Sequence, residues 1–74
     1  MSLPKKLLLD TLYDELHSLS NSSIAISKYD EAAFKERAIS QEQHYHIVQA
    51  LTGIREAHKH IQNAITDIES EDTE

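Results

Sequence analysis

An apolar seam in the C-terminal half of the chain restricts the fold more than any other feature of the sequence. Its positions recur at spacings of 3, 4, 3, 4, 3, 4 and 3 residues, the a/d pattern of a helix that packs along one face for nearly four heptads. They are His44, Ile47, Leu51, Ile54, His58, Ile61, Ile65 and Ile68. Ser40 and Gln43 form a capping box before this run, so the sequence predicts one continuous helix over about 41–69.

The same region contains an internal repeat. Residues 41–54 and 55–68 agree at seven of fourteen positions. Fourteen residues are two heptads, so a packed helix face matches itself at that offset in its apolar residues. Packing does not require the shared Glu-x-His-x-His, which indicates either an old internal duplication or a paired functional feature.

The N-terminal part predicts a second helix. Ser2 can act as its N-cap, and Pro4 suits its first turn because the missing N–H has no partner there. Its apolar stripe, which falls within an arc of about 100°, consists of Leu8, Leu9, Leu12, Leu16 and Leu19. We therefore expect a helix over about 3–19.

The middle of the chain allows two interpretations. Ser and Asn at 20–23 favour a break, because their side chains compete with the helical backbone. The 3–4 spacing nevertheless continues to Ile26, which slightly favours a helix that ends near residue 28. A short third helix is predicted over about 30–38, with Asp30 as its cap and Phe34 as its apolar anchor.

Composition agrees with an all-α chain. One Gly, one Pro and no Cys occur among 74 residues, which excludes disulfides and cysteine-based zinc sites. Five of the thirteen acids lie in residues 67–74, without a base, whereas residues 1–66 hold 7 bases and 8 acids. We predict a single helical domain over 1–66 and an acidic, frayed C-terminal tail over 67–74.

No apolar run is long enough for a signal peptide or a membrane span, so the cytoplasm is the default location.

The length of the predicted 41–69 helix indicates a partner. It would measure about 43 Å, whereas a compact globule of this length is about 30 Å across. Exposure of Ile61, Ile65 and Ile68 would forgo about 1.5–3 kcal/mol each. The g positions, Ala50, Ala57 and Ala64 among them, would let another helix come close. The sequence therefore predicts a homodimeric bundle of helical hairpins, with the eight seam residues as its interface.

The histidines do not form helical metal pairs. Residues two apart on a helix point about 200° away from each other, so neither His44 with His46 nor His58 with His60 can hold one ion. For the seam pair, His44 and His58, we favour neutral, hydrogen-bonded spacers that fix the register. The alternatives are an acid-sensitive dimer and an intersubunit zinc or nickel site.

The outward histidines have acidic neighbours. His46 follows Glu42 by four residues, and His60 follows Glu56 in the same way. Exposed pairs of this kind contribute only a few tenths of a kcal/mol. No nucleophile accompanies them, so we predict no catalytic residues, no cofactor and no enzymatic activity.

Binding of another protein is the class of function that the sequence favours, because it disfavours nucleic-acid binding. The few aromatic residues and scattered bases do not make a nucleic-acid surface. We predict a small non-catalytic protein–protein interaction module, a regulator, inhibitor or adaptor of the kind that phages and mobile elements often encode, which acts as a homodimer. Its partner surface is expected around Tyr45, His46, Gln49 and Gly53, with Leu7 as a secondary candidate. The alternatives are an acidic nucleic-acid-mimic decoy and a pH- or metal-responsive regulator that uses His44 and His58.

Overall fold

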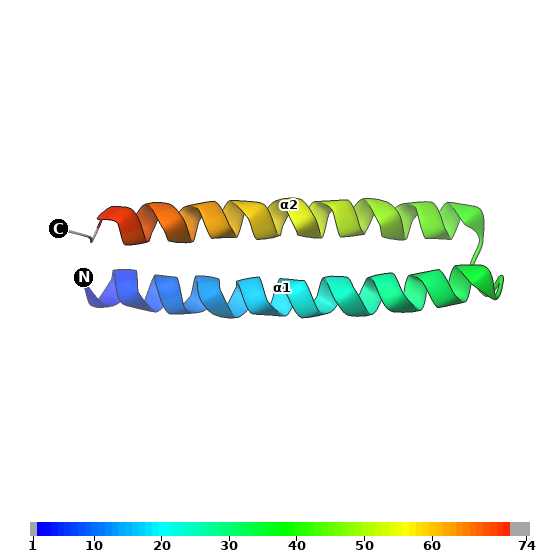
Figure 1. Cartoon of the computed structure of the whole chain (residues 1–74), viewed down its shortest axis with the longest axis horizontal. Helices are drawn as coiled ribbons and strands as arrows, with labels where there is room; N and C mark the ends of the chain where they lie inside the picture. The colour runs from blue at the N-terminus through cyan, green and yellow to red at the C-terminus, as the bar shows by residue number, and fades with distance from the viewer. Residues whose placement is uncertain (1, 72–74) are drawn as a thin grey trace.

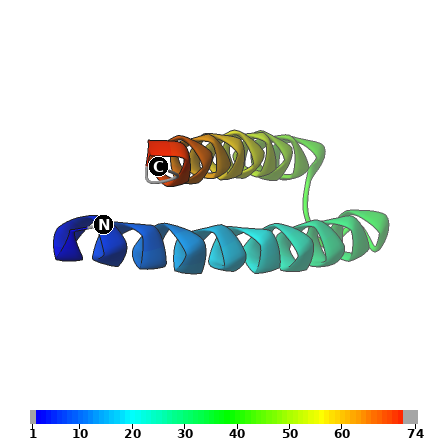
Figure 2. The ribbon, with the colours of Figure 1, turned by 60° about the vertical axis from the view of Figure 1, so that its left-hand side comes forward.

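The computed structural model describes residues 2–71, and these residues form a hairpin of two long helices (Figure 1). Helix α1 spans Leu3–Lys35 and helix α2 spans Gln41–Glu71. The views in Figures 1 and 2 both place the start of α1 and the end of α2 at one end of the hairpin and the connection at the other. The hairpin measures 55 × 15 × 15 Å and its radius of gyration is 16.7 Å, against about 11 Å for a compact chain of this length. The predicted all-α hairpin is confirmed, and it is a rod.

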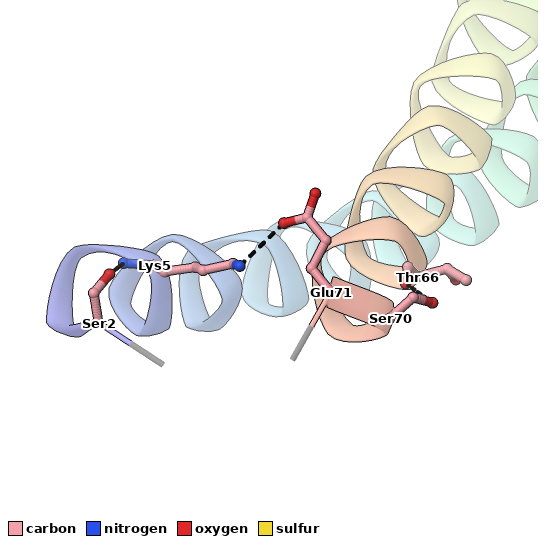
Figure 3. Close-up of polar contacts among 5 residues, drawn as sticks. All are labelled: Ser2, Lys5, Thr66, Ser70 and Glu71. Atoms are coloured by element: carbon pink, nitrogen blue, oxygen red, sulfur yellow. Dashed lines mark hydrogen bonds and ion pairs between the residues drawn. The ribbon is translucent and has the colours of Figure 1, made fainter. Parts of the chain in front are cut away.

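Both helices begin where the sequence predicts. Lys5 N–H donates to Ser2 Oγ at 3.4 Å before α1 (Figure 3). Before α2, Ser40 N–H donates to Gln43 Oε1 at 2.8 Å, while Gln43 N–H donates back to Ser40 Oγ at 3.1 Å. This reciprocal pair satisfies backbone donors that have no partner within the helix.

Helix α1 ends in a left-handed residue rather than at a glycine or proline. Arg37 has φ 61°. Ala38 N–H donates to the Ala33 carbonyl at 2.8 Å, and Arg37 N–H donates to the Phe34 carbonyl at 3.0 Å. These two hydrogen bonds are those of a Schellman motif, which satisfies the last carbonyls of a helix and turns the chain away from its axis.

The predicted third helix is wrong. Helix α1 runs without a break through residues 20–23 and 30, and it ends at Lys35. Asp30 is not a cap but a buried residue in the interior of α1. The physical reason is tertiary packing, which overrides the weak local preference of Ser and Asn for a break. The alternative prediction, a first helix that ends near residue 28, is closer to the structure, but it places the end of α1 seven residues too early.

Residues 67–71 of the predicted acidic tail belong to α2, and residues 72–74 lie outside the described residues. At this open end, Lys5 Nζ lies 3.1 Å from Glu71 Oε2 (Figure 3). Figure 3 also shows the hydroxyl of Ser70, which donates to the Thr66 carbonyl at 2.8 Å. The ion pair joins the two helices, although exposed pairs of this kind stabilise a fold little.

The core between the helices is small. Among the described residues, only three apolar side chains are buried, namely Leu9, Leu51 and Ile65. The other apolar seam positions are half-buried: Leu12, Leu16, Leu19, Ile47, Ile54, Ile61 and Ile68. Leu8, which the sequence assigns to the stripe of α1, is 49% exposed. Neither helix of the described chain has a stretch long and apolar enough to span a membrane.

Candidate functional site

A polar cluster joins the two helices near the connection. His44 Nδ1 lies 3.0 Å from Asp30 Oδ1 and 2.8 Å from Asp30 Oδ2. An ionised carboxylate only accepts hydrogen bonds, so Nδ1 carries the proton and donates. The Phe34 ring stacks on the imidazole with centroids 4.1 Å apart. Asp30 is only 7% exposed, and this contact with His44 is what satisfies its buried carboxylate.

A second polar contact occurs two heptads further along α2. His58 Nε2 lies 3.4 Å from Ser20 Oγ, and both side chains are half-buried. They line a groove of about 230 Å³ on one side of the hairpin, together with Leu19, Ser23, Ile24, Ile54 and Arg55. The small Ser20 and Ser23 side chains leave this space open, where leucine would fill it.

Both seam histidines therefore face α1 of the same chain. The fourteen residues between His44 and His58 correspond to about 21 Å along the helix, so one chain cannot bring them to a single ion. Within residues 2–71, no group of three or more His, Cys, Asp or Glu side chains is close enough to hold a metal. Each histidine has a polar partner in its own chain, which favours the role of a hydrogen-bonded spacer.

The partners of these histidines on α1 were not predicted from the sequence. Asp30 was assigned to a helix cap, and Ser20 to a region of uncertain structure. The signal that could have found them is the heptad in α1, because Leu9, Leu16, Ser23 and Asp30 recur every seven residues. That spacing places Asp30 on the same inward face as Leu9.

The predicted partner-binding residues lie on the outer part of α2. Tyr45, His46, Gln49 and Gly53 are all exposed, with Tyr45 at 57%. We call these four residues the outer patch. The Tyr45 and His46 rings meet edge to face, with centroids 5.6 Å apart. His46 Nε2 lies 3.9 Å from Glu42 Oε1, which is the exposed pair that the sequence predicts.

Gly53 occupies open space. A Cβ atom at this position would meet no atom within 4 Å. Glycine in a helix interior costs about 0.5–1 kcal/mol relative to alanine. No contact within the described chain requires glycine here. Leu7, the secondary candidate, is 56% exposed on α1.

One titratable group at the open end is clearly perturbed. Tyr13 donates its hydroxyl to Glu69 Oε2 at 2.8 Å. This hydrogen bond to a carboxylate, with smaller contributions from desolvation and from the charge of Glu69, raises the pKa of Tyr13 above its ordinary value of 10.0. The contact connects α1 to α2 and does not form part of the outer patch.

Comparisons with known proteins add no constraint on this geometry. No protein-family model matches the chain, and neither the curated proteins nor the solved structures give a match to it.

Proposed function

We propose that this protein is a small non-catalytic interaction module, which acts as a homodimer and binds another protein through the outer patch of α2. The observation that carries the proposal is the imbalance between buried and exposed apolar side chains. Three apolar side chains are buried among the described residues, whereas ten large ones are exposed. The core of a chain of this size rarely contributes more than about 3–5 kcal/mol, and small proteins often add oligomerisation, a metal or disulfides. This chain has no cysteine.

The outer patch supports the second half of the proposal. Tyr45 presents a large aromatic surface, and tyrosine is enriched among residues that contribute most to binding at interfaces. Gly53 lies eight residues further along α2, and it leaves the helix backbone accessible to an approaching partner. Because glycine lowers helix stability without any compensating contact in the chain, a close approach by a partner gives it a function.

The homodimer is tested by sedimentation equilibrium at micromolar concentration. We expect a mass twice that of the 8.4 kDa chain. A mass of 8.4 kDa, together with a fully folded circular dichroism spectrum, would contradict the proposed homodimer.

The partner surface is tested by site-specific photo-crosslinking in cells of the source organism. The photoreactive residue p-benzoylphenylalanine replaces Tyr45 in one variant and Asn63 in the other. Both positions are exposed on α2, and Asn63 lies outside the outer patch. We expect a covalent adduct with a second protein from position 45 and none from position 63. Adducts from neither position, or equal adducts from both, would contradict a partner surface at the outer patch.

A further inference from the structure

The two long sides of the hairpin differ in chemistry. On α2, the e positions and the g positions of the heptad flank the seam on opposite sides. The e positions are Val48, Arg55, Gln62 and Glu69, whereas the g positions that follow Gln43 are all alanine: Ala50, Ala57 and Ala64. One side of the seam is therefore largely polar, and the other consists of small apolar residues.

The grooves between the helices show the same difference. The groove that contains Arg55 and His58 also contains Ile24 of α1. A second groove, of about 370 Å³, contains Ile26 of α1 and Ile47 of α2. Ile24 and Ile26 are two residues apart, so they point to opposite sides of α1. The other lining residues of the second groove are Ala25, Tyr29, Asp30, Ala33 and Ile39.

The side that holds the second groove has a continuous apolar row on α2. Seven positions alternate isoleucine and alanine, and none of them is charged. We call them the alanine face: Ile47, Ala50, Ile54, Ala57, Ile61, Ala64 and Ile68. None of the seven is buried in the single chain: Ala50 and Ala57 are exposed, and the other five are half-buried.

The size of this side fits a second copy of the chain. A whole long side of the 55 × 15 Å rod, with α1 and α2 together, corresponds to roughly 800 Å², and each partner in a standard protein interface buries about this area. The alanine face is the α2 part of such a side, and Ile26 and Tyr29 in the second groove belong to its α1 part. Small residues at g let two helix backbones approach closely, so that the isoleucines of each copy pack beside the alanines of the other. A two-fold symmetric contact needs one surface that is complementary to itself, and a row of alternating large and small residues meets that requirement.

Charge selects the orientation of the two copies. Asp67, Glu69 and Glu71 lie at the C-terminal end of α2, with no base in its last turn. Within the chain, Glu71 pairs with Lys5 and Glu69 accepts a hydrogen bond from Tyr13, both on α1. A parallel arrangement would bring these acids near those of the second copy and would align the two helix dipoles. An antiparallel arrangement opposes the two helix dipoles. It places these acids near the N-terminal end of the second α2, where the helix dipole favours negative charge and where one acid, Glu42, lies in the first turn.

We propose that two copies associate through their alanine faces, with α2 of one chain antiparallel to α2 of the other. This inference rests on the proposed homodimer and specifies its interface and orientation. The arrangement covers Ile47, Ile61 and Ile68 together with the three alanines. Ile54 also lines the groove that contains Arg55 and His58, so it lies between the two sides, and the polar residues of that groove remain on the opposite side of the hairpin.

Three matched variants test which side is covered, because each adds one glutamate to an exposed position of α2. Ala57→Glu places the charge on the alanine face, Gln62→Glu on the polar side, and Thr52→Glu on the outer side. We expect Ala57→Glu to raise the dissociation constant of the dimer by at least about 100-fold, because it buries an unpaired charge. Gln62→Glu and Thr52→Glu should change it by less than about threefold, since exposed charges interact weakly.

The outcomes separate this inference from the homodimer itself. A wild-type protein that sediments as a single chain contradicts both. A wild-type dimer that Gln62→Glu dissociates, while Ala57→Glu does not, contradicts the alanine face and leaves the homodimer standing.

Spin labelling tests the orientation without disturbing the face, and it remains informative if Ala57→Glu fails to fold. The chain has no cysteine, so Gln41→Cys gives one nitroxide at the start of the 31-residue α2. In the antiparallel dimer, the two labels should be about 45 Å apart, which is the length of α2 at 1.5 Å per residue. A separation below about 25 Å would contradict the antiparallel arrangement.

Discussion

The open half and the connection half of the hairpin are held together by different interactions. In the open half, the inward face of α1 consists of leucines, and Leu9 and Ile65 are buried there. In the connection half, the inward face of α1 holds serines and the buried Asp30, and this carboxylate accepts a hydrogen bond from His44. One helix thus changes from an apolar to a polar contact surface within a continuous run of turns.

This difference shows that two parts of one hairpin can have different roles: one stabilises the fold by apolar burial, and the other fixes the alignment of α1 against α2. Apolar burial is strong but not directional, so a leucine stripe tolerates small shifts of one helix along the other. A hydrogen-bonded pair such as Asp30 and His44 requires one alignment, and a buried carboxylate left without its partner is costly. Two of the three buried apolar residues, Leu9 and Ile65, lie in the open half. The connection half holds the third, Leu51, together with the hydrogen bond that fixes which residues lie opposite one another.

The largest expected effect comes from breaking the apolar half. Ile65 is 4% exposed, and Ile65→Ala should lower the free energy of unfolding by about 2–4 kcal/mol, through lost burial and the cavity left behind. Urea unfolding followed by circular dichroism at fixed protein concentration measures it. Ile24→Ala is the control, because Ile24 is 69% exposed. Equal losses in the two variants would show that Ile65 is not a core residue.

Removal of the polar pair should have the next largest effect. Asp30→Ala leaves the half-buried His44 without its hydrogen-bond acceptor, and we expect a loss of about 1–3 kcal/mol in the free energy of unfolding. The double variant Asp30→Leu with His44→Leu should recover most of this loss, since apolar residues can replace a buried polar pair without leaving a group unsatisfied. Losses that simply add in the double variant would indicate that the two side chains do not interact.

A substitution in the connection should have a smaller effect and should stabilise the fold. Arg37 holds φ 61°, a left-handed conformation that costs a residue with a Cβ about 1 kcal/mol. Arg37→Gly should therefore raise the free energy of unfolding by about 0.5–1 kcal/mol, because glycine adopts this conformation without strain. The same urea experiment measures it, with Lys35→Gly as the control that should destabilise the helical last turn. A destabilised Arg37→Gly would mean that the arginine side chain makes a necessary contact.

The smallest effect concerns pH at the open end. The hydrogen bond to Glu69 raises the pKa of Tyr13 above 10.0 in the folded protein, and the unfolded phenol ionises near its ordinary value. The contact therefore stabilises the fold fully below pH 10, and its contribution disappears as the pH rises through the raised pKa. Tyr13→Phe should remove this dependence, as measured by thermal unfolding at a series of alkaline pH values. An identical alkaline dependence in both proteins would contradict a bond between Tyr13 and Glu69 in solution.

Individual residues show how far local pattern predicts this fold. The capping box of Ser40 and Gln43 and the N-cap Ser2 were predicted correctly, because each depends on neighbours within three residues. The continuation of α1 through Ser20 and Asp30 was not, since their local preference favours a break and only contact with α2 reverses it. The left-handed Arg37 had no signal in the sequence, because such positions usually hold glycine.

Some features of the candidate site were also predictable from the sequence, and others were not. The exposure of Tyr45, His46, Gln49 and Gly53 followed from their place outside the seam, and the structure confirms it. The partners of His44 and His58 did not follow, because they lie on the other helix. The homodimer and its protein partner remain predictions that the experiments above address.

The sequence by itself determined that this protein is helical, where its helices begin, and which face of α2 is apolar, because caps and heptads act between residues at most one or two turns apart. Only the tertiary structure decided that α1 is one helix, that Asp30 is buried against His44, and which side of the hairpin is left apolar. Those features depend on which residues of α1 lie opposite which residues of α2. That alignment is set by burial and hydrogen bonding between segments distant in the chain.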